Sequence, residues 1–369
     1  MKCKVWFMMS HARAGGAERV YWILSQYFDK SKFEVSLVLL DASRPFFSTN
    51  LKDVSIIYLK SQRASKAFFK LCKLIKEERP SAIFSNGSHL NILMAMVSVF
   101  APIPLLIGRE ANVPEEHAKQ GSFKDFFWDK FLSLAYKRIG WGICQSEEIK
   151  RSLSRKYRIP SKKLTIIPNP VLATPIRRSS GGLNGRKLIA VGRLSTEKGL
   201  FRLIDIIKNL PEEYTLSIAG DGPLKDSLQK KIKELNLEDR ITLLGMIKNV
   251  QQVISEHDVL VLPSFSEGFP NVVLEALSVG VPVVSFKVSG ISAMIEHGFN
   301  GYVVSQNDLE GFKKKIILAI ENDWDIQSIK ADVSAKFGVH KVVKMYESLV
   351  PTALNGLPLS PKIAAEWRD

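Results

Sequence analysis

The chain has 369 residues, which is too long for one core of ordinary size and predicts two domains. Hydrophobic residues make up 46% and charged residues 24%, proportions that are typical of a soluble globular protein and argue against long disordered segments. The formal net charge is +15, and residues 1–172 hold nearly all of it, with 28 Lys+Arg against 14 Asp+Glu. This skew predicts that the first half faces an anionic partner, such as a membrane surface, a lipid-linked phosphate or a nucleic acid.

The cysteines and the apolar runs indicate the compartment. Cys3, Cys72 and Cys144 are odd in number and lack the spacing of a zinc site, which favours a reducing cytosol. The first apolar run is too short for the core of a signal peptide. The most apolar region, 92–107, contains two prolines and falls short of the roughly 20 residues that span a bilayer. We therefore expect a cytoplasmic protein without a transmembrane segment.

Short β-type runs alternate with helical patterns along most of the chain. The first half has helical stretches such as 18–28 and 66–78, and its expected strands are 3–10, 33–40, 54–59, 82–86, 104–109, 141–146 and 164–170. A second series of expected strands comprises 187–194, 214–220, 241–245, 259–264 and 281–286. Continuous apolar strands that alternate with helices are typical of a parallel sheet covered on both faces.

A break in this pattern divides the chain. Segment 173–186 is rich in Pro, Ser and Gly and is the predicted linker between an N-terminal domain, 1–172, and a C-terminal domain, 187–338. Helix 339–350 follows and is expected to pack back on the N-terminal domain, before a tail at 351–369. The predicted fold is α/β, with two Rossmann-like doubly wound domains that face each other across a cleft. Ligands of such sheets bind at the carboxyl ends of the strands.

The stretch PSFSEGFPNVVLEALSVGVPVV carries the strongest chemical signal. Pro270 suits the first turn of a helix, so a helix should begin near 269–271 with free N–H groups that attract an anion. Glu275 then lies inside this helix among apolar neighbours, where a carboxylate is costly to bury unless it is hydrogen-bonded. A vicinal diol, such as a ribose, offers two O–H donors to its two oxygens. The alternative is that Glu275 is an exposed residue of an amphipathic helix.

Two glycine-containing turns add weaker signals. In VGRLSTEKG a strand ends at Gly192, and the cations of Arg193 and Lys198 suit a diphosphate, although a solvated basic loop would have the same sequence. Gly15 and Gly16 lie between the first strand and the first helix and allow a close backbone approach to a ligand. This pair lacks the G-x-G-x-x-G pattern, so a dinucleotide fingerprint is not supported.

Taken together, these segments resemble a known family. The chain is similar to the retaining, two-domain nucleotide-sugar glycosyltransferases of family 4, also called glycosyltransferase group 1, of the bacterial surface-polysaccharide type. The matching segments are GGAERV, VGRLSTEKG, AGDGP and LPSFSEGFPNVVLEALSVGVPVV. In the last segment, Glu267 and Glu275 form the E-x7-E pattern of the family. The resemblance implies the GT-B fold, with the donor held mainly by the second domain.

The resemblance also implies an activity. A hexose or N-acetylhexosamine would be transferred from a nucleotide diphosphate sugar to a lipid-linked or surface oligosaccharide, with retention of the anomeric configuration. The nucleotide would be UDP, as the family resemblance favours, and no metal or other cofactor would be needed. Glu275 would hold the ribose diol, and Glu267 would lie near the sugar ring. Arg193 and Lys198 would stabilise the diphosphate leaving group.

Further donor-site residues follow from the same resemblance. Backbone contacts to sugar and phosphate would come from residues 268–271, and the first domain would approach the phosphates at its glycine pair. The additional donor-binding residues are Gly15, Gly16, Gly192, Gly245, Met246, Gly268, Phe269, Pro270 and Asn271, of which Gly245 and Met246 would lie near the base.

The sequence departs from the family at one place. Many members carry a histidine after a first-domain strand, whereas this chain has LLIGREANVP, with Arg109 and Glu110. These two residues are candidates for a catalytic role, and an ion-paired loop is the alternative. His11 and His89 could also lie at the edge of the cleft, but a lone histidine is more often structural. The D-x-D at 323–325 is interpreted as a helix start or loop and not as a Mg²⁺ site.

The basic half contains the features of a membrane-binding surface. Lys66, Lys70, Lys73 and Lys76 share one helical face, and SFKDFFWDKF adds aromatic residues, so peripheral binding to the anionic inner face of the cytoplasmic membrane is predicted. Core apolar residues beside solvated lysines are the alternative. Two other functions stay open: a nucleotide-sugar epimerase of the same fold, and a nucleic-acid-binding protein, for which no motif is found. No nucleic-acid partner is therefore expected, and the sequence predicts no oligomeric state.

Overall fold

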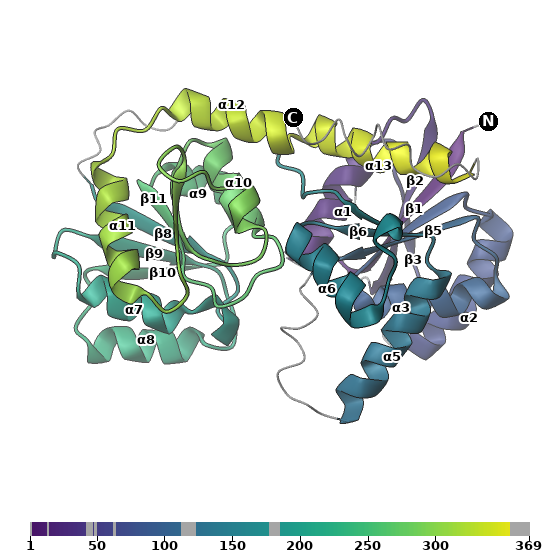
Figure 1. Ribbon diagram of the computed structural model, residues 1–369, viewed down its shortest axis with the longest axis horizontal. Coiled ribbons are helices and arrows are strands. Elements are labelled where there is room, and N and C mark those ends of the chain that lie inside the picture. Colours follow the sequence, from purple (N-terminus) through teal and green to yellow (C-terminus); the bar gives the residue numbers. More distant parts are fainter. Residues whose placement is uncertain are drawn as a thin grey trace. The chain divides into compact units, whose positions relative to one another are not determined.

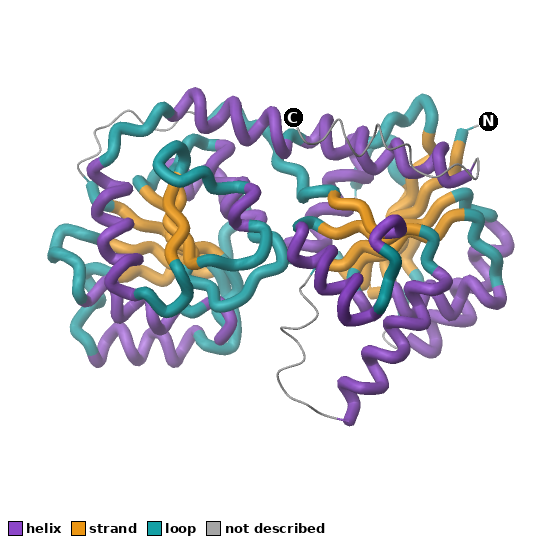
Figure 2. The backbone as a smooth tube through the Cα atoms, viewed as in Figure 1, coloured by secondary structure: helices purple, strands orange, loops and turns teal. Residues whose placement is uncertain are grey.

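The computed structural model describes residues 2–12, 15–41, 47, 50–61, 64–111, 123–176 and 185–354. The chain divides into two compact units: the first unit comprises Met1–Pro170 with Val339–Asp369, and the second comprises Val171–Gly338. The first boundary lies two residues before the expected one. Of the expected linker, 177–184 lie outside the described residues. In each unit the strands form a layer between helices (Figure 2).

The first unit contains a seven-stranded parallel sheet in the order β3-β2-β1-β4-β5-β6-β7. Its strands are β1 (Cys3–His11), β2 (Phe33–Asp41), β3 (Ser55–Tyr58), β4 (Ala82–Asn86), β5 (Leu105–Glu110), β6 (Trp141–Cys144) and β7 (Leu164–Ile166). Its helices are α1 (Gly16–Tyr27), α2 (Ala64–Glu78), α3 (Ser88–Phe100), α5 (Phe123–Arg138), α6 (Glu147–Tyr157) and α13 (Val339–Leu354), with a 3-10 turn η2 (Ser161–Lys163).

Helices cover both faces of this sheet (Figure 1). Helices α2, α3, α5 and α6 pack in that order on one face, and α1 and α13 pack on the other. All five residues of β4 are buried, as expected for a parallel strand that is covered on both sides. Helix α13, expected at 339–350, extends to Leu354, and its Tyr346 ring lies 5.6 Å from the ring of Phe84 in β4.

The second unit contains a six-stranded parallel sheet in the order β10-β9-β8-β11-β12-β13. Its strands are β8 (Lys187–Val191), β9 (Thr215–Ala219), β10 (Ile241–Gly245), β11 (Val259–Leu262), β12 (Val283–Phe286) and β13 (Gly301–Val304). Its helices are α7 (Leu200–Lys208), α8 (Lys225–Glu234), α9 (Val250–Ser255), α10 (Asn271–Ser278), α11 (Leu309–Glu321) and α12 (Ile326–Phe337), with 3-10 turns η3 (Thr196–Lys198) and η4 (Ile291–Ala293).

The strand order of the second unit reverses at β8. The chain runs from β8 outward to β9 and β10, and then returns to pair β11 with the other side of β8. The carboxyl ends of β8 and β11 therefore form a topological switch point, which is where open α/β sheets bind ligands. The prediction of two Rossmann-like domains is confirmed, and β13 is a strand that the sequence analysis missed.

The first unit exposes apolar side chains on neighbouring helices. Phe69 of α2 is 74% exposed and Phe100 of α3 is 61% exposed. We call the following residues the apolar face: Phe69, Met96, Val99, Phe100, Phe127, Phe131 and Leu134. Their helices are in contact, since α2 packs against α3 and α3 against α5. The alternative that the apolar residues of the two predicted membrane-binding stretches are core is therefore wrong for Phe69, Phe127 and Phe131 and correct for Ile75. The side chains of Phe123, Phe126 and Trp128 lie outside the described part.

Phe69 of the apolar face has lysines three and four positions away on the same helix. The predicted basic face of α2 is exposed, since Lys66, Lys70, Lys73 and Lys76 all lie at the surface.

Across the part of the chain that the structure describes, no helix is both long and apolar enough to cross a bilayer.

A buried polar network joins the carboxyl ends of four adjacent strands in the first unit. Arg109, at the end of β5, is only 1% exposed. Its guanidinium donates to Oδ1 of Asn86 in β4 (2.7 Å) and to Oδ1 of Asn169 after β7 (2.6 Å). Gln145, after β6, accepts from its Nε (3.1 Å) once the amide is oriented to suit its neighbours. The alternative of an ion-paired loop is therefore wrong, because Arg109 is a strand residue bonded to neutral amides.

Glu110 lies on the opposite side of β5. Its two carboxylate oxygens share the single donor of the Ser88 hydroxyl (3.0 Å to each), at the start of α3. Burial raises the pKa of Glu110 to about 7, although the hydrogen bonds from Ser88 act against that rise.

This pKa makes the stability of the protein depend on pH. The folded chain holds a proton on Glu110 between pH 4.5 and about 7 that the unfolded chain releases. The resulting stabilisation is complete below pH 4.5 and is lost as pH rises through 7, by up to about 3 kcal/mol. Glu110→Gln imitates the protonated form, so it should raise the thermal unfolding midpoint at pH 8 and change it little at pH 5. Exposed Glu148→Gln is the control, and an equal effect of Glu110→Gln at both pH values would contradict this account.

Candidate active site

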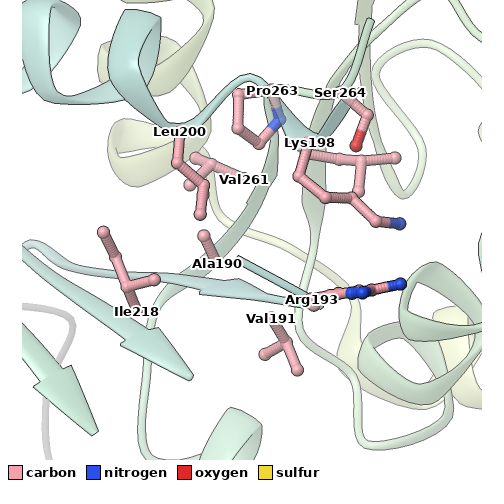
Figure 3. Close-up of a pocket in the computed structure, with 11 residues that line it drawn as sticks. Ala190, Val191, Arg193, Lys198, Leu200, Ile218, Val261, Pro263 and Ser264 are labelled. Carbon is pink, nitrogen blue, oxygen red and sulfur yellow. The ribbon is translucent and has the colours of Figure 1, made fainter. Parts of the chain in front are cut away.

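A pocket in the second unit opens at the carboxyl ends of β8 and β11, at the switch point of the sheet. It is lined by 190–193, Lys198, Leu200, Ile218 and 261–264. Figure 3 shows apolar side chains on one side of the pocket, whereas the nitrogen atoms of Arg193 and Lys198 extend in a common direction away from them. The pocket therefore combines an apolar wall with two cationic groups.

Glycines allow the strand ends to meet at this pocket. Gly220, after β9, has a φ of +142°, and a Cβ on it would lie 1.8 Å from the carbonyl oxygen of Gly192. No other residue fits such an approach. The Leu194 N–H donates to the carbonyl of Asp221 (3.0 Å), so the AGDGP loop holds the turn that carries Arg193.

An ion pair connects the two sides of the pocket. The Lys198 ammonium lies 2.7 Å from Oε1 of Glu267, and the Ser264 hydroxyl donates to the same oxygen (2.6 Å). Arg193 is exposed and forms no ion pair with any residue that the structure describes. An entering anion would therefore meet one cation that a carboxylate already orients and one that is available to bind.

Helix α10 begins as predicted. Pro270 is its N-cap residue and Asn271 its first residue. Glu275, in the second turn, is 7% exposed, so the alternative of an exposed amphipathic position is wrong. The ring of Phe269 is buried and contacts the ring of Phe337 (6.3 Å between centroids), which leaves only the backbone of Phe269 to contact a ligand.

The other predicted site residues lie in two places. Gly245 ends β10 with a φ of +68°, its carbonyl accepts from the Gly220 N–H (2.8 Å), and exposed Met246 follows it on the same sheet edge. These two residues and 268–271 do not line the pocket itself. The remaining predicted residues lie in the first unit. Gly15 and Gly16 are at the start of α1, and Arg109 and Glu110 are at the end of β5.

The D-x-D segment has a structural role. The carboxylate of Asp325 caps α12 by accepting from the backbone N–H of Ser328 (3.0 Å), which confirms its interpretation as a helix start. Within the described ranges, no three His, Cys, Asp or Glu side chains are grouped so that they could hold a metal ion.

Sequence analysis missed Arg202, which is bonded to two residues that line the pocket. It lies on α7 with its side chain buried among apolar neighbours and donates to the carbonyls of Pro263 and Ser264. The signal was present, because a charged residue within the buried pattern of LFRLIDII raises the same question as Glu275.

Comparisons with known proteins agree with this architecture. Residues 14–172 match the family model of Glycosyltransferase Family 4, and residues 175–335 match that of Glycosyl transferases group 1. The structure resembles the crystal structure of Anabaena HepE in complex with UDP and glucose, with a TM-score of 0.78 and 21% sequence identity. That similarity covers 95% of this chain and 100% of HepE.

Two relatives with assigned activities are similar over most of the chain. The Escherichia coli UDP-Gal:alpha-D-GlcNAc-diphosphoundecaprenol alpha-1,3-galactosyltransferase is 26% identical over 331 residues, covering 82% of this chain and 84% of that protein. The Campylobacter jejuni GalNAc-alpha-(1->4)-GalNAc-alpha-(1->3)-diNAcBac-PP-undecaprenol alpha-1,4-N-acetyl-D-galactosaminyltransferase is 27% identical over 336 residues, covering 87% and 89%. The motifs, the two parallel sheets and these matches agree, and the chain belongs to the family 4, group 1 glycosyltransferases, which have the GT-B fold.

Proposed function

We propose that this protein is a retaining glycosyltransferase that moves a hexose or N-acetylhexosamine from a UDP-sugar to a lipid-linked oligosaccharide of surface-polysaccharide synthesis. The observation that carries the proposal is the pair of cations, Arg193 and Lys198, at the switch-point pocket. The E. coli relative is named for UDP-Gal and a diphosphoundecaprenol acceptor, and the HepE crystal contains UDP and glucose. These names support the donor base and the acceptor class.

The chemistry assigned to the pocket is stabilisation of a leaving group. Breaking the bond between the sugar carbon and the diphosphate leaves extra negative charge on the phosphate oxygens. Arg193 can bind those oxygens with two donors, and the Lys198 ammonium keeps two N–H groups free while Glu267 accepts the third. Fixed charges that meet the developing charge lower the barrier. In a retaining transfer, the proton of the acceptor hydroxyl passes to the departing phosphate on the same face, so a carboxylate base is not required.

The proposed reaction needs no metal ion. Arg193 and Lys198 supply at the diphosphate the positive charge that Mg²⁺ supplies in other transferases. We assign to Glu275 the hydrogen bonds from both ribose hydroxyls, because it is the second carboxylate of the E-x7-E pattern and lies in the helix that follows the Ser264–Glu267 loop.

Nucleotide binding tests the cation pair. UDP should raise the thermal unfolding midpoint, since a ligand at 100 times its Kd stabilises by about 2.7 kcal/mol, and EDTA should not change the shift. Arg193→Met should weaken UDP binding about 10- to 100-fold, because charged hydrogen bonds contribute about 1.5–3 kcal/mol. Arg186→Met, at the amino end of β8, is the matched control. Absence of a UDP shift, or its loss in EDTA, would contradict the proposal.

The role of Glu275 predicts a preference for ribose. Wild-type protein should bind UDP at least about tenfold more tightly than 2′-deoxy-UDP, because the deoxy analogue cannot donate one of the two hydrogen bonds to the carboxylate. Glu275→Gln should reduce this preference to about threefold or less while the fold survives, since the amide keeps the volume but offers one acceptor oxygen. Calorimetric titration measures both constants, with exposed Glu256→Gln as control. An unchanged preference in Glu275→Gln would refute the assignment.

Peripheral membrane binding is part of the proposal. The apolar face and the exposed lysines of α2 together form an apolar patch with a cationic rim, as at the surface of interfacial proteins. The excess of cations in residues 1–172 complements an anionic leaflet, where each adds about 1 kcal/mol. The cytoplasmic face of a membrane would then give access to an undecaprenol-linked acceptor.

Vesicle binding tests this surface. The protein should co-sediment with vesicles that contain anionic phospholipid at low salt, and less with purely zwitterionic vesicles. The double change Phe100→Ser with Phe131→Ser should lower the bound fraction several-fold while the UDP-induced shift persists. Leu318→Ser, at an exposed leucine of α11 in the second unit, is the control. If the double variant and Leu318→Ser bound vesicles equally well, the assignment of the apolar face as the membrane-binding surface would be wrong.

A further inference from the structure

Arg202 is a buried cation whose partners are all neutral. Its side chain on α7 is 8% exposed. Nε donates to the carbonyl of Pro263 (2.7 Å), one terminal nitrogen donates to the carbonyl of Ser264 (2.7 Å), and the other donates to Oε1 of Gln306 (3.0 Å). Its partners in the described structure include no carboxylate. A buried charge without a counter-ion is costly, so its retention calls for a physical reason.

Two aromatic rings enclose the guanidinium. Its carbon lies 3.9 Å from the ring centroid of Phe265 and 3.9 Å from that of Phe286. Burial lowers the pKa of Arg202 to about 10, so the group stays charged at neutral pH. Stacking and a planar fork of donors are properties of arginine that lysine lacks.

Gln306, after β13, completes the arrangement. Its Oε1 accepts from Arg202, while its Nε2 donates to the carbonyls of Ser264 (3.1 Å) and Lys287 (3.0 Å). The Ser264 carbonyl therefore receives two donors. We call Arg202 and Gln306 the brace.

The brace is bonded to the backbone carbonyls of the loop after β11, and side chains of the same loop take part in the candidate active site. Pro263 and Ser264 are buried and follow β11, where the sheet no longer supplies donors to their carbonyls, and a buried carbonyl needs a donor. In the same loop, the Ser264 hydroxyl donates to Oε1 of Glu267, and this oxygen also accepts from the Lys198 ammonium. Gly199 fixes the distance between loop and helix, because a Cβ there would lie 2.1 Å from the Pro263 carbonyl oxygen.

We propose that the brace is a positioning device that fixes Ser264 and Glu267, and through them sets the Lys198 ammonium at the diphosphate. The inference rests on the proposed function and adds two residues that do not line the pocket. Without the guanidinium, the Pro263 carbonyl loses the donor Nε and the Ser264 carbonyl keeps only the donor from Gln306, so the loop rearranges. Glu267 then no longer presents its oxygen at the position that orients Lys198.

The first test separates positioning from mere stability. Arg202→Met should lower kcat about tenfold or more and should weaken UDP binding less than Arg193→Met does, because Arg193 and Glu275 still bind. The loss should largely disappear in a Lys198→Met background, since both changes remove the same interaction. Arg240→Met is the matched control, because the Arg240 guanidinium also donates to backbone carbonyls of the second unit, those of Tyr214, Ile207, Leu210 and Pro211. Full additivity of Arg202→Met with Lys198→Met, or an equal loss in Arg240→Met, would overturn the proposal.

A second test does not depend on catalysis. NMR of methyl-labelled lysines, with the Lys198 signal identified by its absence in Lys198→Arg, should show that signal shifted in Arg202→Met and in the milder Gln306→Met, and unshifted in Arg240→Met. If the chemical shift of Lys198 were the same in the brace variants as in wild-type protein, the inference would be overturned, whatever their activity. If the brace variants shift the signal but wild-type protein neither binds UDP nor transfers sugar, the positioning stands and the proposed function fails.

Discussion

The candidate active site depends on the contact between the Lys198 ammonium and the Glu267 carboxylate. These residues are 69 positions apart in sequence, and the adjacent strands β8 and β11 bring their loops together. Each side has its own support: Gly192 and Gly220 let the strand ends approach at β8, and Ser264 orients the carboxylate at β11. The position of the cation therefore follows from the order of strands in the sheet and not from its own loop alone.

Charge is used differently in the two units. The second half of the chain is nearly neutral, yet the cations of Arg193 and Lys198 are concentrated at one pocket. The first half has a large excess of cations spread over its sequence, including the lysines of α2, the helix that also carries Phe69 of the apolar face. Net charge alone would favour a nucleic-acid-binding protein. The positions of the individual cations in the structure favour a glycosyltransferase instead.

Sequence analysis succeeded where the signal was local. Continuous apolar runs predicted the strands, and a carboxylate among apolar residues predicted that Glu275 is buried. It missed β13, a four-residue strand that starts with glycine, because so short a run carries little periodicity. Arg109 was assigned to a catalytic site or an ion-paired loop, because its amide partners Asn86 and Asn169 come from distant parts of the chain. The pairing of Lys198 with Glu267 likewise depends on tertiary contacts.

Phosphorus NMR of UDP titrated with the protein in EDTA tests the central claim most directly, because it observes the groups that Arg193 and Lys198 are proposed to bind. The account predicts that both phosphate resonances shift and broaden on binding to wild-type protein, and that the change in the terminal phosphate is lost in Lys198→Met. Unperturbed resonances with wild-type protein, or a perturbation that appears only when Mg²⁺ is added, would contradict it.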